Sequence, residues 1–125
     1  MEHGTNVNKE NIDGETPLFI LCKNGNEFLV KYLMEHEVNI NKENHDGKIA
    51  LFNAFYSGNE AIEKCLVDHG ADINKEDHKG ETPLFEACRN CDEAMVKYLV
   101  EHGADVNKED RNGRTPLSNA LFYGN

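Results

Sequence analysis

The feature that most constrains this chain is a repeat with a period of 33 residues. Gly14, Gly47, Gly80 and Gly113 are spaced 33 residues apart, and they begin the segments G-E-T-P-L-F, G-K-I-A-L-F, G-E-T-P-L-F and G-R-T-P-L-S. Histidine, asparagine, lysine and glutamate recur in the same register along the chain. A fixed period between about 20 and 50 residues is the signature of stacked supersecondary units. The sequence therefore predicts a solenoid built from copies of one repeat.

The shared repeat resembles the ankyrin repeat. The resemblance is carried by T-P-L at residues 16–18, 82–84 and 115–117 and by G-A-D-h-N, with h apolar, at residues 70–74 and 103–107. It covers essentially the whole chain and implies an all-α solenoid of helix–turn–helix units joined by short hairpin loops. We expect one domain over residues 1–125, with partial repeats at 1–10 and 110–125 and full repeats at 11–43, 44–76 and 77–109. No capping repeat with a polar outer face is visible, so we expect a segment of a longer array.

The residue pattern predicts where the two helices of each repeat begin and end. A threonine caps the first helix and a proline takes its first position, whereas an asparagine or aspartate caps the second. The expected caps are Thr16, Thr82 and Thr115 for first helices and Asn26, Asn59 and Asp92 for second helices. Glycines in the left-handed conformation are expected to end the helices, at Gly25, Gly58 and Gly124 and at Gly70 and Gly103. Leu29, Tyr32, Leu33 and His36 have the i, i+3, i+4, i+7 spacing of a buried stripe.

Five residues depart from the repeat. Ile49 and Ala50 replace Thr-Pro, Glu63 stands where the other repeats have valine, and Glu37 and Cys91 replace glycines. The sequence predicts that the helix after Ile49 loses its cap, at about 1 kcal/mol. A side chain kept in the left-handed region costs roughly 1–2 kcal/mol. Drift in a tolerant array and shaping by a partner are both open as explanations.

Charge and composition exclude several classes of partner. The chain has 13 lysines and arginines against 23 aspartates and glutamates, a formal net charge of −10. Nucleic-acid binding needs clustered basic residues, so no nucleic-acid partner is expected. No apolar run reaches the length of a membrane span, and no membrane partner is expected. Four cysteines in a repeat framework indicate reduced thiols and a cytoplasmic, intracellular location, with delivery into a host cell as an effector left open.

The residues that could carry chemistry are explained better by the repeat itself. Cys88 and Cys91 form a lone C-x-x-C, which is a weak metal or redox signal without a second pair. His36, His69 and His102 recur once per repeat at helix ends, where they can interact with the helix dipole. No phosphate loop, nucleophile elbow or H-E-x-x-H pattern is present. We therefore predict no enzyme activity, no metal and no cofactor.

A protein-binding surface is the functional prediction. In the family that this chain resembles, hairpin tips and the concave face of the first helices grip a partner protein. The matching tip positions are Ile12, Asp13, Glu15, His45, Asp46, Lys48, His78, Lys79, Glu81, Arg111, Asn112 and Arg114. The matching first-helix positions are Lys23, Asn24, Tyr56, Ser57, Arg89 and Asn90. These residues differ between repeats while the frame stays constant, so they are free to carry specificity, although lack of constraint would produce the same variation.

Three further hypotheses follow from the sequence. The array is alternatively a structural or self-associating spacer attached to an absent enzyme, channel or effector domain, because Leu117, Leu121 and Phe122 lie in an unfinished repeat. Asn74 and Asn107 resemble positions at which ankyrin-type proteins are hydroxylated. The tips also change from acidic at Asp13 and Glu15 to basic at Arg111 and Arg114, which predicts a partner with the opposite order of charge.

Overall fold

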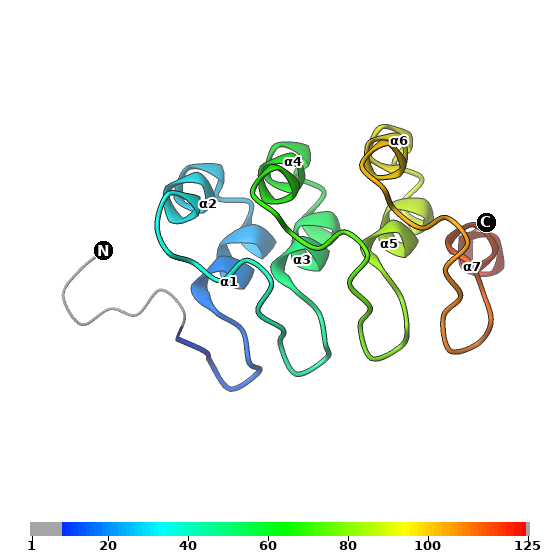
Figure 1. Ribbon diagram of the computed structural model, residues 1–125, viewed down its shortest axis with the longest axis horizontal. Helices are drawn as coiled ribbons and strands as arrows, with labels where there is room; N and C mark the ends of the chain where they lie inside the picture. Colours follow the sequence, from blue (N-terminus) through cyan, green and yellow to red (C-terminus); the bar gives the residue numbers. More distant parts are fainter. Residues whose placement is uncertain (1–8, 125) are drawn as a thin grey trace. The chain divides into compact units, whose positions relative to one another are not determined.

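The computed structural model describes residues 9–124 of the chain, with side chains as far as Phe122. This part of the chain is all-α, with seven helices and no strand. The helices are α1 (Pro17–Asn24), α2 (Glu27–Met34), α3 (Ala50–Ser57), α4 (Glu60–Asp68), α5 (Pro83–Arg89), α6 (Glu93–Glu101) and α7 (Pro116–Gly124) (Figure 1). They alternate between a first and a second helix of each repeat, and a hairpin loop precedes each first helix. The predicted fold class is confirmed, and most of the predicted partial repeat at residues 1–10 lies outside the described residues.

The helices group into two compact units, which we describe separately. The N-terminal unit extends to Ala71 and contains α1 to α4, and the C-terminal unit begins at Asp72 and contains α5 to α7. In the N-terminal unit, α1 packs on α2 and α3, and α4 packs on α2 and α3. In the C-terminal unit, α5 packs on α6 and α7. First helices of successive repeats therefore lie side by side within each unit (Figure 1), while the single domain over residues 1–125 stays a prediction.

The prediction that threonine side chains cap the first helices is wrong for two of them. The hydroxyls of Thr16 and Thr82 are buried and make no hydrogen bond within the described residues. The amide three positions into the helix instead donates to the backbone carbonyl of the cap residue, at 3.0 Å in both cases. The carbonyl of Ile49 accepts the same bond at 3.0 Å. Because a backbone carbonyl accepts this hydrogen bond in all three helices, Ile49 at the start of α3 does not lose a side-chain cap that Thr16 or Thr82 provides. Only Thr115 uses its hydroxyl, accepting from the amide of Ser118 at 3.3 Å.

The predicted caps of the second helices are confirmed. The side chains of Asn26, Asn59 and Asp92 each accept a hydrogen bond from the backbone amide three residues later, at 3.1, 3.1 and 3.2 Å. A side-chain oxygen at this position satisfies one of the donors that a helix start leaves free. These caps fix the start of each second helix at the same register of the repeat.

The helix ends show which departures from glycine cause strain. Gly25 and Gly58 end α1 and α3 at φ 75° and 73°, as predicted. Cys91 occupies the equivalent place after α5 and keeps a left-handed φ of 55°, the only non-glycine residue in the described part of the chain with positive φ. Glu37 does not, because α2 ends at Met34 with Glu35 as its cap. The predicted strain therefore exists at Cys91 and is avoided at Glu37.

The core is formed by the first helices and one side of each second helix. Phe19, Phe52 and Phe85 occupy the same position of successive first helices, and all three are buried. The predicted stripe on α2 is wrong, because Leu29, Tyr32 and His36 are exposed and the buried residues are Val30, Leu33 and Met34. The buried face is the one that contacts α1 and α4, about one residue around the helix from the predicted stripe.

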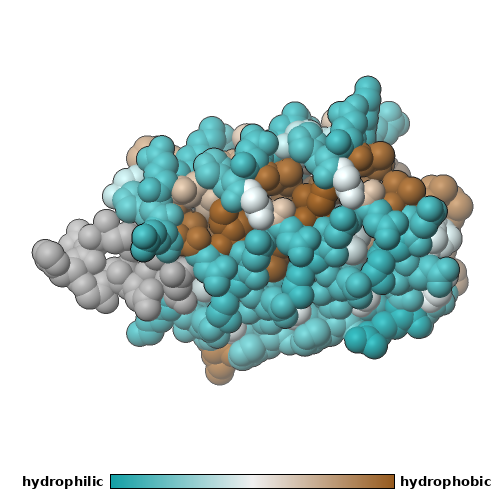
Figure 2. Space-filling model, viewed as in Figure 1, coloured by the Kyte–Doolittle hydropathy of each residue, from teal (hydrophilic) through white to brown (hydrophobic). Residues whose placement is uncertain are grey.

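A carboxyl group is also part of the core. Glu63 on α4 has no exposed surface, at the position that Val30 occupies on α2. Polar residues otherwise cover most of the face drawn in Figure 2, and the hairpin loops along its lower edge are largely hydrophilic. The linker before the third hairpin is not wholly in solvent, because Ala71 and Asp77 are buried. Lys42 pairs with Glu10 at 2.6 Å and Lys108 with Glu76 at 3.5 Å, so lysines and glutamates of successive repeats form ion pairs.

Candidate functional site

Each hairpin is held by the side chain of its first residue. In the C-terminal unit, Asp77 Oδ1 accepts hydrogen bonds from the amides of Lys79 and Glu81 at 2.9 and 3.0 Å. Asp110 Oδ1 accepts in the same way from the amides of Asn112 and Arg114, both at 2.9 Å. Asn11 and Asn44 do this in the N-terminal unit. Asparagine and aspartate favour such turns because their short side chains reach backbone amides two residues on. The same frame therefore projects different tip residues in each repeat.

Neighbouring tips within a unit are joined by one backbone hydrogen bond. The amide of His45 donates to the carbonyl of Asp13 at 3.0 Å, and the amide of Arg111 donates to the carbonyl of Lys79 at 3.0 Å. The second contact brings the backbone of Arg111 so near Gly80 that an added Cβ would lie 3.2 Å from its amide nitrogen. Gly80 also has φ 77°, so a side chain there would be strained as well as crowded.

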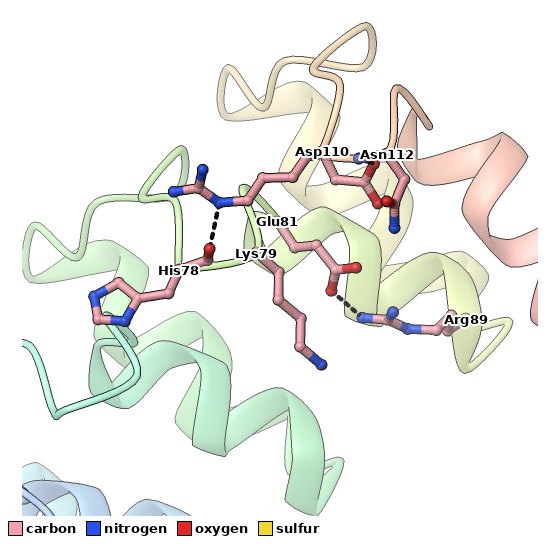
Figure 3. A pocket seen from close by; sticks show the side chains of 7 residues that line it. His78, Lys79, Glu81, Arg89, Asp110 and Asn112 are labelled. Carbon is pink, nitrogen blue, oxygen red and sulfur yellow. Dashed lines mark hydrogen bonds and ion pairs between the residues drawn. The ribbon is translucent and has the colours of Figure 1, made fainter.

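A polar pocket lies between the two tips of the C-terminal unit and α5 (Figure 3). Its volume is about 660 Å³. The residues that line it are His78, Lys79, Glu81, Arg89, Asp110, Arg111 and Asn112, and we call it the Arg89 pocket. Six of these seven residues belong to the binding surface predicted from the sequence. The structure thus brings together predicted positions from two hairpins and one helix.

The floor of the Arg89 pocket is a network of buried and half-buried polar side chains. Arg89 donates to Glu81 Oε1 at 2.8 Å, to Glu86 Oε1 at 3.3 Å and to Asn119 Oδ1 at 3.1 Å. Asn119, which is 1% exposed, donates to Glu81 Oε2 and to Asp110 Oδ2 at 3.4 Å each. A guanidinium carries five N–H donors in a planar fork, so a single arginine can bind several acceptors at once. The network links the two hairpins of the pocket to α5 and α7.

The charges of this floor stabilise one another. Burial lowers the pKa of Arg89, but the hydrogen bond and charge of Glu81, with a further contribution from Glu86, raise it above its ordinary value. Glu81 is only 9% exposed although it was predicted as a tip residue. Its carboxylate therefore faces Arg89 and Asn119 rather than solvent, and it forms part of the pocket floor.

The N-terminal unit has the same hairpins without this network. Glu15 and Lys23 occupy the positions of Glu81 and Arg89, and Lys23 is exposed. Asn53 occupies the position of Asn119, but its side chain donates to the backbone carbonyl of Phe19 at 3.2 Å. The cavity described in this unit is elsewhere, between α2 and α4, with a volume of about 370 Å³. The Arg89 pocket is therefore a local feature built on the common frame.

Most other predicted binding residues lie on the surface. The exposed ones outside the Arg89 pocket are Ile12, Asp13, Lys23, Asn24, His45, Asp46, Tyr56, Ser57 and Asn90. Glu15, Lys48 and Arg114 are half-buried. The Arg114 guanidinium lies 3.7 Å from the ring centroid of Phe122, and Lys48 Nζ lies 5.7 Å from that of Phe52. Tyr56 is 75% exposed, while its neighbour Phe55 is buried and adds no aromatic surface.

Three residues of the site were missed by the sequence analysis. Asp110 could have been identified from the repeat, because the same position holds a turn-forming asparagine or aspartate in the other hairpins, at Asn11, Asn44 and Asp77. Glu86 precedes Arg89 by three residues on α5, a spacing at which opposite charges on a helix meet. Asn119 could not have been identified from the sequence, because Asn53 is also an asparagine at the same repeat position but has a different hydrogen-bond partner.

Within residues 9–124, a thiol and an imidazole meet at Cys65 and His69, whose Sγ and Nδ1 atoms lie 3.8 Å apart. Burial raises the pKa of Cys22 to about 12 and also raises the pKa of Cys65 and of Cys88, so these groups stay as thiols at neutral pH. Nδ1 of His36, His69 and His102 lies 2.8 Å from the carbonyl oxygen four residues earlier, so this nitrogen donates to the end of the helix. No group of three or more metal-binding side chains occurs within residues 9–124.

Comparison with known proteins agrees with this architecture. A family model described as ankyrin repeats, in three copies, matches residues 1–77 and 64–125, which together span the chain. No curated protein matches the chain. Within the described part of the chain, no helix has the length and apolar character needed to cross a membrane.

Proposed function

Because the chain belongs to the ankyrin-repeat family, we propose that it holds a partner protein through its hairpin tips and the exposed faces of its first helices. Ankyrin repeats are generally modules for protein–protein interaction, and the family is typically non-enzymatic. The surface named here for binding comprises the tip and first-helix positions predicted above, with the Arg89 pocket as its most structured part.

One observation carries this proposal. The first residue of every hairpin is asparagine or aspartate, and in each case its side chain holds the turn through two backbone amides. The next position is exposed in all four hairpins and reads Ile12, His45, His78 and Arg111. A rigid scaffold that presents differing side chains on ordered loops is a common arrangement for recognition. Ordered loops also lose less conformational entropy when a partner binds.

The test compares three baits made from the whole 125-residue chain. The first is the wild type, and the second carries alanine at the exposed tip positions Ile12, His45, His78 and Arg111. The third is a control with alanine at exposed second-helix positions, Lys31, Glu93 and Lys97. We expect proteins from the source cell that bind the wild type and the control but not the tip variant, as measured by quantitative mass spectrometry. Equal recovery with the tip variant would contradict a binding role for the tips.

Self-association is a second candidate, favoured by the surface of α7. Leu117, Leu121 and Phe122 are 65%, 69% and 63% exposed. Leucines at the same repeat position as Leu117, which are Leu18, Leu51 and Leu84, are all 2% exposed or less. Leu117 is therefore open where its counterparts are buried, and an exposed apolar patch of this kind can bind a second copy. Light scattering over a concentration series would then show a rising mass for the wild type and a constant mass for Leu121→Glu.

A further inference from the structure

We propose that the Arg89 pocket recognises an acidic segment of a partner protein, with a carboxylate side chain bound at the rim that carries Lys79 and Arg111. This inference rests on the proposed function and adds to it the chemistry of the partner at one site. The charged groups that line the pocket are of two kinds, carboxylates bonded within the protein and cations exposed at the rim (Figure 3).

The carboxylates of the pocket are occupied. Glu81 accepts from Arg89 through Oε1 and from Asn119 through Oε2. Asp110 accepts two backbone amides through Oδ1 and the Asn119 amide through Oδ2. Both residues are less than a tenth exposed. A cationic ligand would therefore have to approach carboxylates that are already hydrogen-bonded and that solvent hardly reaches, which disfavours a basic segment.

The cations at the rim are free. Lys79 is exposed, and its ammonium forms no hydrogen bond or ion pair within residues 9–124. Arg111 donates from Nε to the backbone carbonyl of His78, and its two terminal nitrogens have no partner in the same part of the chain. Ammonium and guanidinium groups are donors only, and they bind ionised acceptors more strongly than neutral ones. The unsatisfied capacity of the pocket is thus for an anion.

Hydrogen bonds hold the backbones of Lys79 and Arg111, and the guanidinium of Arg111, in position before any ligand arrives. The amide of Arg111 donates to the carbonyl of Lys79 at 3.0 Å, and the Nε bond to His78 directs the guanidinium across the neighbouring hairpin. The carboxylates of Asp77 and Asp110 fix the two turns from which Lys79 and Arg111 project. Preorganised donors reduce the ordering cost of binding, so a single anionic side chain can be recognised at this point.

The charge of the lining favours a carboxylate over a doubly charged phosphate. Lys79, Arg89 and Arg111 balance Glu81, Glu86 and Asp110, so the pocket and its floor are neutral when His78 is neutral. A bound carboxylate adds one negative charge above the buried carboxylates, whereas a phosphate dianion adds about two. In the N-terminal unit the positions of Lys79 and Arg111 are Asp13 and His45, so the same site is not repeated there.

The net charge of −10 makes this recognition short-ranged. At low salt the whole chain repels an acidic segment, while contact with Lys79 and Arg111 attracts it. The screening length is about 10 Å at 0.1 M salt, so moderate salt weakens the long-range repulsion more than the close contact. Binding of an acidic segment is therefore expected to depend less steeply on salt than binding to an extended basic surface.

The experiment titrates the ¹⁵N-labelled full-length chain with short synthetic peptides and follows the amide resonances. One peptide contains glutamates, and matched peptides carry glutamine, lysine or phosphoserine at the same places. We expect the glutamate peptide to shift the amides of residues 78–81 and 110–114 and to bind more tightly than the other three. Lys79→Glu is expected to weaken the glutamate peptide about fivefold or more, since a favourable exposed pair becomes a repulsive one.

The matched control is Lys97→Glu, which makes the same charge change at an exposed position of α6. It is expected to change the affinity less than about twofold, because its charge lies outside the pocket. The inference is overturned if the glutamine peptide binds as tightly, if the phosphoserine or lysine peptide binds more tightly, if no peptide binds, or if the two variants lose affinity equally. Those results leave the bait comparison above unaffected, so a failure of this inference is distinct from a failure of the proposed function.

Discussion

Cys91 offers a direct measurement of the strain that the repeat avoids elsewhere. Its φ is 55°, at the repeat position where Gly25 and Gly58 have φ 75° and 73°. A Cβ in the left-handed region costs roughly 1–2 kcal/mol. Glycine at position 91 would also make the unfolded chain more flexible, which lowers the free energy of unfolding by roughly 0.5–1 kcal/mol. The difference predicts that Cys91→Gly raises the free energy of unfolding by about 0.5–1 kcal/mol.

The side chain of Cys91 is exposed, so its removal loses little buried surface. Urea unfolding under reducing conditions, followed by circular dichroism, should show a higher midpoint with an unchanged slope. Two controls isolate the backbone from the thiol. Cys91→Ala keeps the Cβ and should match the wild type. Gly58→Ala adds a Cβ at φ 73° with no atom within 4 Å, so it should lose the amount that Cys91→Gly gains. An unchanged or lower midpoint for Cys91→Gly, or stabilisation by Cys91→Ala alone, would refute the reasoning.

Three further predictions concern buried polar groups. Glu63→Val replaces a buried carboxyl by the apolar residue that stands at position 30, so it should raise the free energy of unfolding by about 1 kcal/mol or more in a urea titration. The reverse change, Val30→Glu, should lower this free energy by about 3 kcal/mol. Arg89→Ala should lower it by about 2–3 kcal/mol, since Glu81 would stay largely buried without its cation; a loss under about 0.5 kcal/mol would show that solvent replaces the pair. Burial raises the pKa of Cys22 to about 12, so between pH 8 and 10 the thiol stays protonated in the folded protein and ionises in the unfolded chain. The free energy of unfolding should therefore fall over this pH range by about 1–2 kcal/mol more in the wild type than in Cys22→Ala.

The sequence predicted the parts of this molecule that local chemistry decides. Asn26, Asn59 and Asp92 cap their helices because the acceptor and the donor are three residues apart on one chain. The tip residues could be identified because the repeat supplies an internal comparison of four hairpins. What failed depended on packing: the threonine hydroxyls were expected to cap, yet backbone carbonyls made those bonds once Thr16 and Thr82 were buried.

The Arg89 pocket could not be predicted as a unit, because its floor depends on contacts between residues far apart in sequence. Arg89 binds Asn119 across 30 residues, and Asn119 approaches Glu81 across 38 residues. The repeat gave no sign of this, since Asn53 and Asn119 are the same residue at the same position. Only the three-dimensional structure distinguishes Asn53, which is bound to a backbone carbonyl, from Asn119, which is bound to three polar side chains.

A comparison of equivalent positions explains how one frame yields a pocket in the C-terminal unit alone. The glutamates at 15 and 81 and the asparagines at 53 and 119 are shared, so neither residue type makes the network by itself. The position of Lys23 holds Arg89, and that of Ile20 holds Glu86. An ammonium on a flexible stem stays in solvent, whereas a guanidinium fork can bind Glu81, Glu86 and Asn119 together. A few substitutions on a constant frame are therefore sufficient to create a distinct binding site, which is the property that a repeat scaffold needs to acquire new partners without changing its fold.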